Sequence, residues 1–276
     1  MQLQDKAVFV TGASRGLGRT LAITLAHKGA RLAICARDAA ALNETVKLCR
    51  AAATRPGAET CVFAVAGDIT DAATCKRMMD EAAARLGGLD LLVLNAGLSM
   101  WAHFEEISDL SLFEELMRVN YLGAVYCVHA ALPHLLAARG KIVAVSSAQA
   151  WSGMPFHTGY AAAKSALQGF LDSLAMEMGD RISILGIYPG WIRDTDLRAS
   201  ALGGDGKALG DSRRSHSSLS VTSQECSDVI LKAVEREWAM AFIPRSARLL
   251  YFMRPIAYPL IKWVLGRAAH SQKETG

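Results

Sequence analysis

Seven short apolar runs, each separated from the next by a stretch with helical periodicity, constrain the fold of this chain more than any other feature. The run at 89–94 is almost continuously apolar, as expected for a strand that is buried on both faces of a sheet. Because a helical stretch lies between consecutive runs, the strands must be joined by crossovers and run parallel. We therefore predict an α/β fold with one doubly wound parallel sheet of about seven strands and helices on both of its faces. The predicted strands are 7–10, 31–36, 60–65, 89–94, 141–145, 182–187 and 239–243.

The composition indicates a single globular domain and excludes several other classes of protein. Of the 276 residues, 51% are hydrophobic and 20% are charged, which is enough to form one sizeable core. The six cysteines show no metal-binding spacing, so we expect reduced thiols, a cytoplasmic setting and no metal site. No apolar run approaches the ~18 residues that cross a bilayer, and we expect no transmembrane helix. The net charge of +4 belongs to the tail, because residues 245–276 sum to +5, and nothing indicates binding to nucleic acid.

A glycine-rich segment follows the first predicted strand. Residues 11–18 read TGASRGLG, and the helical pattern after them places Leu21 and Leu25 on one side. Free backbone N–H groups and the helix dipole at such a strand–turn–helix junction attract a diphosphate. The segment therefore predicts the start of a Rossmann-type dinucleotide-binding unit, which the second strand completes.

The end of the second predicted strand bears on the choice of dinucleotide. An acidic residue at this position selects the ribose 2′-hydroxyl of NAD, whereas an arginine accommodates the 2′-phosphate of NADP. Here the strand ends in Ala36 and Arg37, and Arg15 in the glycine-rich segment is a second cation. We expect NADP(H) as the cofactor, although Arg37 alone could also be a solvated charge at the start of a loop.

Polar or small residues follow the other predicted strands, at the edge of the sheet where doubly wound folds bind their ligands. Asp68 follows the third strand, and its carboxylate could contact an adenine amino group or cap the next helix, as Thr70 or Asp71 could. The next strands end in Asn95-Ala96-Gly97, Ser146-Ser147 and Pro189-Gly190.

Tyr160 and Lys164 lie four residues apart in an alanine-rich stretch that favours a helix, so their side chains share one helical face. An unperturbed tyrosine has a pKa near ~10, and a nearby ammonium group favours the phenolate. The pair is therefore a candidate acid/base catalyst. Taken alone, the YxxxK pattern also occurs on the surface of ordinary helices.

In this order the segments resemble the short-chain dehydrogenase/reductase family over essentially residues 5–245. The matching residues are TGASRGLG at 11–18, Asp68, NAG at 95–97, Asn120, Ser147, YAAAK at 160–164 and PG at 189–190. The resemblance implies four catalytic residues, since Ser147 lies thirteen and Asn120 forty residues before Tyr160. Ser147 would hold the substrate carbonyl, Tyr160 would give its oxygen a proton, and Lys164 would hold the nicotinamide ribose. Asn120 would position a water that links Lys164 to solvent; otherwise it is a buried polar residue of a helix predicted at 109–138.

The resemblance also implies which residues bind the cofactor. The family's usual PGxxxT pattern would place a threonine at 194, but here Asp194 stands there and the threonine is displaced by one residue to Thr195. Its contact to the nicotinamide carboxamide is therefore an open point, whereas Ile192 keeps its place. By their positions in the motifs, the cofactor-binding residues are Gly12, Ser14, Arg15, Gly16, Leu17, Gly18, Arg37, Asp68, Ile69, Asn95, Ala96, Gly97, Tyr160, Lys164, Pro189, Gly190, Ile192 and Thr195.

Aromatic and sulfur-containing side chains follow the strand-end motifs and predict a pocket for a lipophilic carbonyl compound. Because none of these side chains is Lys or Arg, a carboxylate-bearing substrate is not expected. His157 in the same region is either a second acid/base group or an ordinary loop residue. The predicted pocket residues are Trp101, Ser147, Trp151, Met154, Phe156 and Trp191, with Ser99, Met100 and Gln149 in the same segments.

Two segments near the C-terminus complete the predicted organisation. Within the domain at 1–245, residues 198–220 are rich in Gly, Ser and Asp and predict a mobile lid over roughly 194–222. A helix at 223–237, capped by Thr222 or Ser223, then leads to the last strand. Residues 246–276 form a basic and apolar extension, which either covers the substrate mouth or a subunit interface, or makes peripheral contact with a membrane.

We therefore predict an NADPH-dependent carbonyl reductase, reversible as an alcohol dehydrogenase, that acts on a lipophilic ketone such as a long-chain oxo-lipid or a steroid-like compound. One alternative is a non-catalytic NADP(H)-binding sensor or scaffold module, and another is a dehydrogenase of a small polar substrate. The resemblance further implies a homodimer or homotetramer. The protein is expected in the cytoplasm, with association to a membrane left open by the tail.

Overall fold

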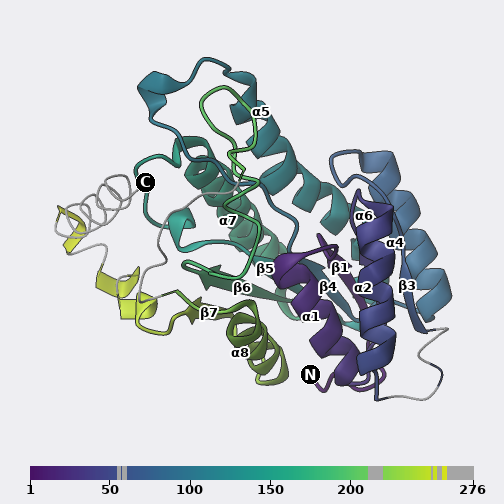
Figure 1. Ribbon diagram of the computed structural model, residues 1–276. Coiled ribbons are helices and arrows are strands. Elements are labelled where there is room, and N and C mark those ends of the chain that lie inside the picture. The colour runs from purple at the N-terminus through teal and green to yellow at the C-terminus, as the bar shows by residue number, and fades with distance from the viewer. Residues whose placement is uncertain (55–56, 58–60, 211–219, 250, 254–256, 260–276) are drawn as a thin grey trace.

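The computed structural model describes residues 1–54, 57, 61–210, 220–249, 251–253 and 257–259 (Figure 1). Its centre is a seven-stranded sheet in the order β3-β2-β1-β4-β5-β6-β7, in which all neighbours are parallel. The predicted doubly wound parallel sheet is therefore confirmed. The third strand is shorter than predicted, and residue 60 lies outside the described residues. The strands are β1 (Ala7–Thr11), β2 (Arg31–Cys35), β3 (Val62–Ala64), β4 (Leu91–Leu94), β5 (Lys141–Val145), β6 (Ser183–Pro189) and β7 (Met240–Ile243).

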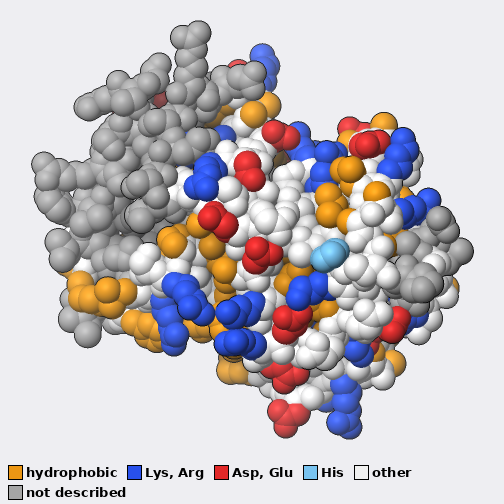
Figure 2. Space-filling view, turned by 60° about the horizontal axis from the view of Figure 1, so that its bottom comes forward, with side chains coloured by type: hydrophobic (Ala, Val, Ile, Leu, Met, Phe, Trp, Pro, Cys, Tyr) orange, Lys and Arg blue, Asp and Glu red, His pale blue; other side chains and the backbone are white. Residues whose placement is uncertain are grey.

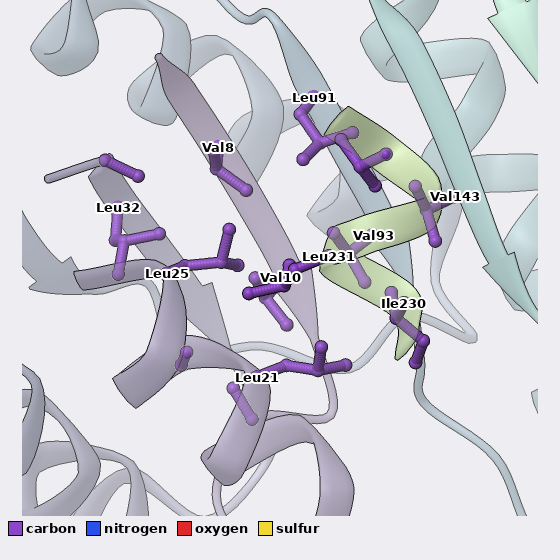
Figure 3. Close-up of a cluster of buried hydrophobic side chains, with 14 of the residues drawn as sticks. Val8, Val10, Leu21, Leu25, Leu32, Leu91, Val93, Val143, Ile230 and Leu231 are labelled. Carbon is purple, nitrogen blue, oxygen red and sulfur yellow. The ribbon is translucent and has the colours of Figure 1, made fainter. Parts of the chain in front are cut away.

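Each face of the sheet has its own hydrophobic core, because successive side chains of a strand point to opposite faces. Val8 and Val10 of β1 pack in one core with α1, α2 and α8, whereas Ala7 and Phe9 pack in the other with α4, α6 and α7. Figure 3 shows the first core, where side chains of α1 and α8 lie against valines of the central strands. These helices are α1 (Gly16–His27), α2 (Ala39–Ala52), α4 (Ala72–Leu86), α6 (Gly123–Ala138), α7 (Thr158–Met178) and α8 (Ser223–Glu235).

Side-chain caps fix where three of the helices begin. Asp38 caps α2, Asp71 caps α4 and Thr222 caps α8, each by accepting a hydrogen bond from a backbone N–H of the first turn. Asp71, and not Asp68, is therefore the cap of α4. The Asp68 carboxylate instead accepts a hydrogen bond of 2.9 Å from the Thr70 N–H, just after β3.

The long helix predicted at 109–138 is interrupted. The chain forms α5 (Ser111–Met117), then a π-helical turn at Arg118–Leu122, then α6. A π turn adds one residue to the helical repeat and commonly occurs at functional sites. Here it contains Asn120, whose side chain bonds to the backbone of Leu98 outside the helix. The hydrophobic pattern continues through the turn, and it therefore predicts one continuous helix without a π turn.

The stretch Ser111–Ala138 bears on the expectation that no helix crosses a membrane. Among the described residues it is the one helical stretch that is long and apolar enough to do so, with a mean hydropathy of 1.3. Length and composition alone are weak evidence, because a helix of a soluble core passes the same test. The expectation stays a prediction.

Part of the segment predicted as a lid is packed against the body. Leu202 pairs with Met100 and with Ala208, and its side chain is buried. Gly204 accepts a hydrogen bond from the Ser108 N–H. Residues 211–219 of the predicted lid lie outside the described residues.

The C-terminal extension returns to the sheet. The ring of Tyr251 lies 4.8 Å from that of Trp151 and 5.1 Å from that of Phe242 in β7, measured between centroids. Whether the extension covers the substrate mouth or a subunit interface, or contacts a membrane, stays a prediction. Residues 250, 254–256 and 260–276 of the extension lie outside the described residues.

Candidate active site

A cavity of about 950 Å³ lies along the carboxyl-terminal edge of the sheet. Every residue that the sequence predicts to bind the cofactor lines it, from Gly12 after β1 to Thr195 after β6. Ser147, Trp101 and Trp191 of the predicted substrate pocket line the same cavity. The cofactor and substrate regions are thus continuous. Asn120 is the one predicted catalytic residue that does not reach the surface of the cavity.

The glycine-rich turn after β1 is shaped by close backbone contacts. Gly12 has a φ of 65°, and a Cβ there would lie 2.7 Å from the Cα of Ala96. A Cβ at Gly18 would lie 2.2 Å from the carbonyl oxygen of Gly12. Only glycine fits these two positions, because β1 and β4 bring the turn and the NAG segment together.

The start of α1 fits the diphosphate of a dinucleotide. The residue before the helix, Arg15, makes no side-chain cap, and the first turn contains no acidic residue. The first backbone N–H groups of α1 thus have no capping side chain, and Gly16 and Leu17 of this first turn line the cavity. Such uncapped amides bind anions.

The adenosine end of the cavity carries the two predicted arginines. Arg15 and Arg37 line it, both are exposed, and neither forms an ion pair with any residue that the structure describes. Asp38 also lines this end, but its carboxylate accepts a hydrogen bond of 3.0 Å from the Ala41 N–H. The Asp38 carboxylate is therefore engaged as the N-terminal cap of α2.

The catalytic side chains meet beside the end of β5. Lys164 Nζ donates a hydrogen bond of 3.1 Å to the Val145 carbonyl oxygen and lies 5.7 Å from the centroid of the Tyr160 ring. Ser147 follows the strand, and its Oγ accepts a hydrogen bond of 3.2 Å from the Gln149 N–H. The Ser147 hydroxyl also acts on the pKa of the Tyr160 phenol. Ser147, Tyr160 and Lys164 are all buried. The neighbouring Ser146 places its Oγ in a buried position without a hydrogen-bond partner among the described residues.

Asn120 uses its whole side chain to hold the loop after β4. Its Oδ1 accepts from the Leu98 N–H at 3.2 Å, and its Nδ2 donates to the carbonyl oxygens of Leu98 at 2.8 Å and Leu116 at 3.0 Å. The loop thus stays where a Cβ added to Gly97 would lie 3.6 Å from Lys164 Nζ. Both side-chain N–H groups are used, so a water bound to this side chain would have to donate to Oδ1, which accepts only one hydrogen bond from the described residues.

Comparison with known proteins agrees with this arrangement. Residues 6–204 match the sequence profile of the short chain dehydrogenase family. The chain belongs to the short-chain dehydrogenase family. It is 31% identical over 263 residues to 11-beta-hydroxysteroid dehydrogenase-like 4A of Arabidopsis thaliana, covering 94% of this chain and 83% of the relative.

Solved structures of short-chain dehydrogenases share the fold. One from Burkholderia phymatum in complex with NAD has a TM-score of 0.79 at 21% identity and covers 94% of this chain and 96% of that one. Another from Burkholderia cenocepacia in complex with NADP has a TM-score of 0.76 at 24% identity and covers 96% and 99%. Both dinucleotides therefore occur in this fold.

Burial dominates the acid/base properties of the pair in this short-chain dehydrogenase. It raises the pKa of Tyr160 to about 12, although the nearby Ser147 hydroxyl acts in the opposite direction. Burial also lowers the pKa of Lys164 to about 8. In the protein alone, desolvation of the phenolate is therefore the largest effect on the pKa of Tyr160. That the Lys164 ammonium and a positive oxidised nicotinamide together favour the phenolate stays a prediction.

The lining of the substrate end differs from the predicted pocket at two aromatic residues: His157 lines the cavity, and Phe156 does not. Trp101, Trp191 and His157 lie against one another, with ring centroids 5.0 to 6.4 Å apart. Phe156 does not line the cavity; it stacks behind Trp101 at 4.9 Å, because a left-handed backbone with φ of 68° turns it inward. The other predicted pocket residues that line the cavity are Ser147, Trp151 and Met154, with Ser99, Met100 and Gln149.

Arg198 lines the cavity as well, which the sequence reasoning missed. Its guanidinium carbon lies 4.7 Å from the centroid of the Trp191 ring. Burial lowers its pKa. The expectation of a substrate region without Lys or Arg is thus corrected. Arg198 lies at the start of a segment whose Gly, Ser and Asp content is typical of a solvated loop, so the sequence did not indicate that its side chain lines the cavity.

The shifted pKa of Lys164 predicts how stability depends on pH in the cofactor-free protein. Between its folded value of about 8 and its ordinary value of 10.5, the unfolded state binds more protons than the folded state. The free energy of unfolding that Lys164 contributes therefore rises with pH across this window. We expect the difference between wild type and Lys164→Met to grow in favour of wild type from about pH 8 to about pH 10 in urea denaturation.

The exposed Lys47 provides the control, because Lys47→Met should show no such trend. Parallel curves for wild type and Lys164→Met would mean that the buried amine titrates normally.

Proposed function

We propose that this short-chain dehydrogenase is an NADP-dependent oxidoreductase that reduces a lipophilic ketone and oxidises the corresponding alcohol. The observation that carries the proposal is the burial of Ser147, Tyr160 and Lys164 together in the wall of a cavity that also contains the uncapped start of α1. When bound, the nicotinamide cofactor would supply or accept the hydride. The protein residues would hold the substrate oxygen and move the proton.

The two hydroxyl groups have different parts in this chemistry. Ser147 would donate a hydrogen bond to the substrate oxygen and stabilise the negative charge that grows on it. Tyr160 would donate its proton to that oxygen, and its high pKa in the protein alone means that the resting phenol is protonated and ready to do so. In the oxidative direction the phenolate has to form, so a positive charge beside the phenol is required there.

Lys164 and Asn120 would support the pair from behind. Lys164 would hold the nicotinamide ribose while its hydrogen bond to the Val145 carbonyl oxygen fixes the amine at the end of β5. Asn120 would keep the loop at Leu98 beside Lys164, and its backbone or its Oδ1 would hold the predicted water.

The lining of the cavity supports a lipophilic substrate. Trp101, Trp151, Met154 and Trp191 provide a large apolar surface, and Tyr251 of the extension lies on Trp151. The relative from Arabidopsis thaliana carries the name of a hydroxysteroid dehydrogenase, which agrees with a steroid-like or long-chain oxo compound. A small polar substrate would leave most of these rings without contact. A non-catalytic NADP(H)-binding sensor or scaffold would have no need for the Ser147–Tyr160 pair.

Tyr160→Phe should lower kcat at least about a hundredfold, because the ring keeps its place but the proton donor is lost. The dissociation constant for NADPH should stay within about threefold of wild type. Turnover is measured by NADPH absorbance with a series of ketones graded by chain length, and binding is measured by calorimetry.

Two serine variants control this result. Ser147→Ala should also be slow, whereas Ser146→Ala, which removes a hydroxyl without a partner among the described residues, should turn over near the wild-type rate. An active Tyr160→Phe variant, or a preference for small polar ketones, would contradict the proposal.

The cofactor preference is proposed from Arg15 and Arg37. Both cations line the adenosine end, while the Asp38 carboxylate is bound to the start of α2. Arg37→Asp should raise the dissociation constant for NADPH about tenfold or more and change that for NADH much less, since only NADPH carries the 2′-phosphate. Arg181→Asp, an exposed arginine of the turn after α7, is the control and should change neither. Equal losses for both dinucleotides in Arg37→Asp would argue against selection by charge.

The extension supports a second proposal, that a cytoplasmic protein makes peripheral contact with a membrane. Leu249, Phe252 and Met253 are exposed beside Arg245 and Arg248, and Figure 2 shows hydrophobic and basic side chains next to one another beside the grey atoms. Exposed apolar groups flanked by cations are typical of segments that bind anionic lipid surfaces.

Replacing Phe252 and Met253 together by Asp should abolish co-sedimentation with phosphatidylserine-containing vesicles, while Tyr251 still covers Trp151. Leu48→Asp, on the exposed side of α2, should sediment like wild type. Unchanged sedimentation of the double variant would exclude this surface.

The apolar stretch at Ser111–Ala138 supports the proposal of a homodimer or homotetramer. Only 33% of its most apolar window is buried within one chain. We propose that α6 and α7 meet their counterparts in a second copy, which would bury this surface. The mass in solution, measured by light scattering, would be that of a single chain if this proposal is wrong.

A further inference from the structure

The loop after β6 is one residue longer than the PGxxxT pattern, and the structure shows where the additional residue is accommodated. The Arg193 N–H donates to the Val221 carbonyl oxygen at 3.0 Å, and the Val221 N–H donates to the Trp191 carbonyl oxygen at 3.0 Å. Ile192 and Val221 form an isolated bridge. The loop is thus joined to the segment that leads into α8.

Asp194, which stands where the pattern has threonine, points to the start of α8. Its Oδ1 accepts a hydrogen bond of 2.6 Å from the Ser223 N–H, and its Oδ2 accepts one of 2.9 Å from the Ser223 hydroxyl. A carboxylate with two such bonds at a helix N-terminus is held firmly, because both the donors and the helix dipole favour negative charge.

The Ser223 hydroxyl extends this contact to α1. Thr20 Oγ1 lies 3.0 Å from Ser223 Oγ and 3.3 Å from the carbonyl oxygen of Gly16. Gly16 is the first residue of α1 and lines the cavity. Because the single Thr20 hydroxyl proton can serve only one of these two oxygens, the hydrogen-bonded path runs from Asp194 through the Ser223 hydroxyl to Thr20 of α1, the helix whose first residue lines the cavity.

Thr195 reaches the same wall directly. A Cβ added to Gly16 would lie 3.3 Å from the Cβ of Thr195, so the two residues are in contact across the cavity wall that both of them line. Thr195, although displaced by one residue from the pattern, thus faces the predicted cofactor region. Asp194, the residue before it, is bonded to Ser223.

We propose that Asp194 is a positioning residue for the cofactor, which holds Thr195 against Gly16 by anchoring the loop to Ser223. The inference rests on the proposed dinucleotide site and deepens it.

Asp194 is not needed as the cap of α8, because another residue caps this helix. Thr222 caps this helix, with its Oγ1 accepting from the Glu225 N–H at 3.1 Å, and Glu225 accepts from the Thr222 N–H at 2.7 Å. With this reciprocal capping box in place, α8 does not need Asp194 to begin. The Asp194 contacts instead connect the loop to the helix.

A double-mutant cycle on NADPH binding tests the proposal, because two residues that act through one contact give non-additive effects. Asp194→Ala and Thr195→Ala should each raise the dissociation constant for NADPH about tenfold, and the double variant should be little worse than either. Calorimetric titration gives all four constants without a substrate, so the result is independent of turnover.

Two further variants control for stability. Thr222→Ala should lower the melting temperature but leave the NADPH dissociation constant within about twofold. Asp194→Asn keeps an acceptor for the Ser223 N–H and should recover part of the affinity, and it replaces Asp194→Ala in the cycle if that variant does not fold.

Multiplicative losses in the double variant would overturn the proposal, as would an unchanged constant for Asp194→Ala. Failure of the wild type to bind either NADPH or NADH would overturn the proposed function, and this inference with it.

Discussion

Because all seven strands run in the same direction, every one of them ends at the same edge of the sheet. Segments that are far apart in the sequence, from Gly12 to Ile192, therefore meet along one cavity. Hydrogen bonds between side chains and backbone join two of these segments: Thr11 Oγ1 accepts from the Asn95 and Ala96 N–H groups, and Asn95 Nδ2 donates to the carbonyl oxygens of Thr11 and Gly12. The shape of the predicted diphosphate site follows from how closely the ends of β1 and β4 approach one another.

Tyr160 and Lys164 are buried in the candidate site, and this burial disfavours the charged forms of both side chains. A phenolate at Tyr160 and an ammonium at Lys164 are both disfavoured in the protein alone, as their opposite pKa shifts show. The resting pair is thus arranged for the neutral phenol, which is the state required to donate a proton. Reduction can begin from this state, whereas oxidation depends on additional positive charge near Tyr160.

The sequence was sufficient for the fold and for the convergence of the strand-end motifs on one cavity, since such motifs in a parallel sheet must meet at the same edge. It was not sufficient where the backbone departs from a regular pattern. Phe156 adopts a left-handed conformation without a glycine to signal it, and its ring turns away from the cavity. The π turn at Asn120 lies in an uninterrupted apolar pattern. The direction of Asp194 depends on α8, which a local motif cannot show.

Because Tyr251 contacts Trp151, one part of the cavity wall can form only late in the folding of the chain during its synthesis. All the predicted catalytic residues precede β6 in the chain, whereas β7 and Tyr251 follow it and are synthesised later. During synthesis the sheet can form from its N-terminal strands while the substrate end is still open on one side. The cavity acquires this part of its wall only when the segment that contains Tyr251 packs onto the end of the sheet.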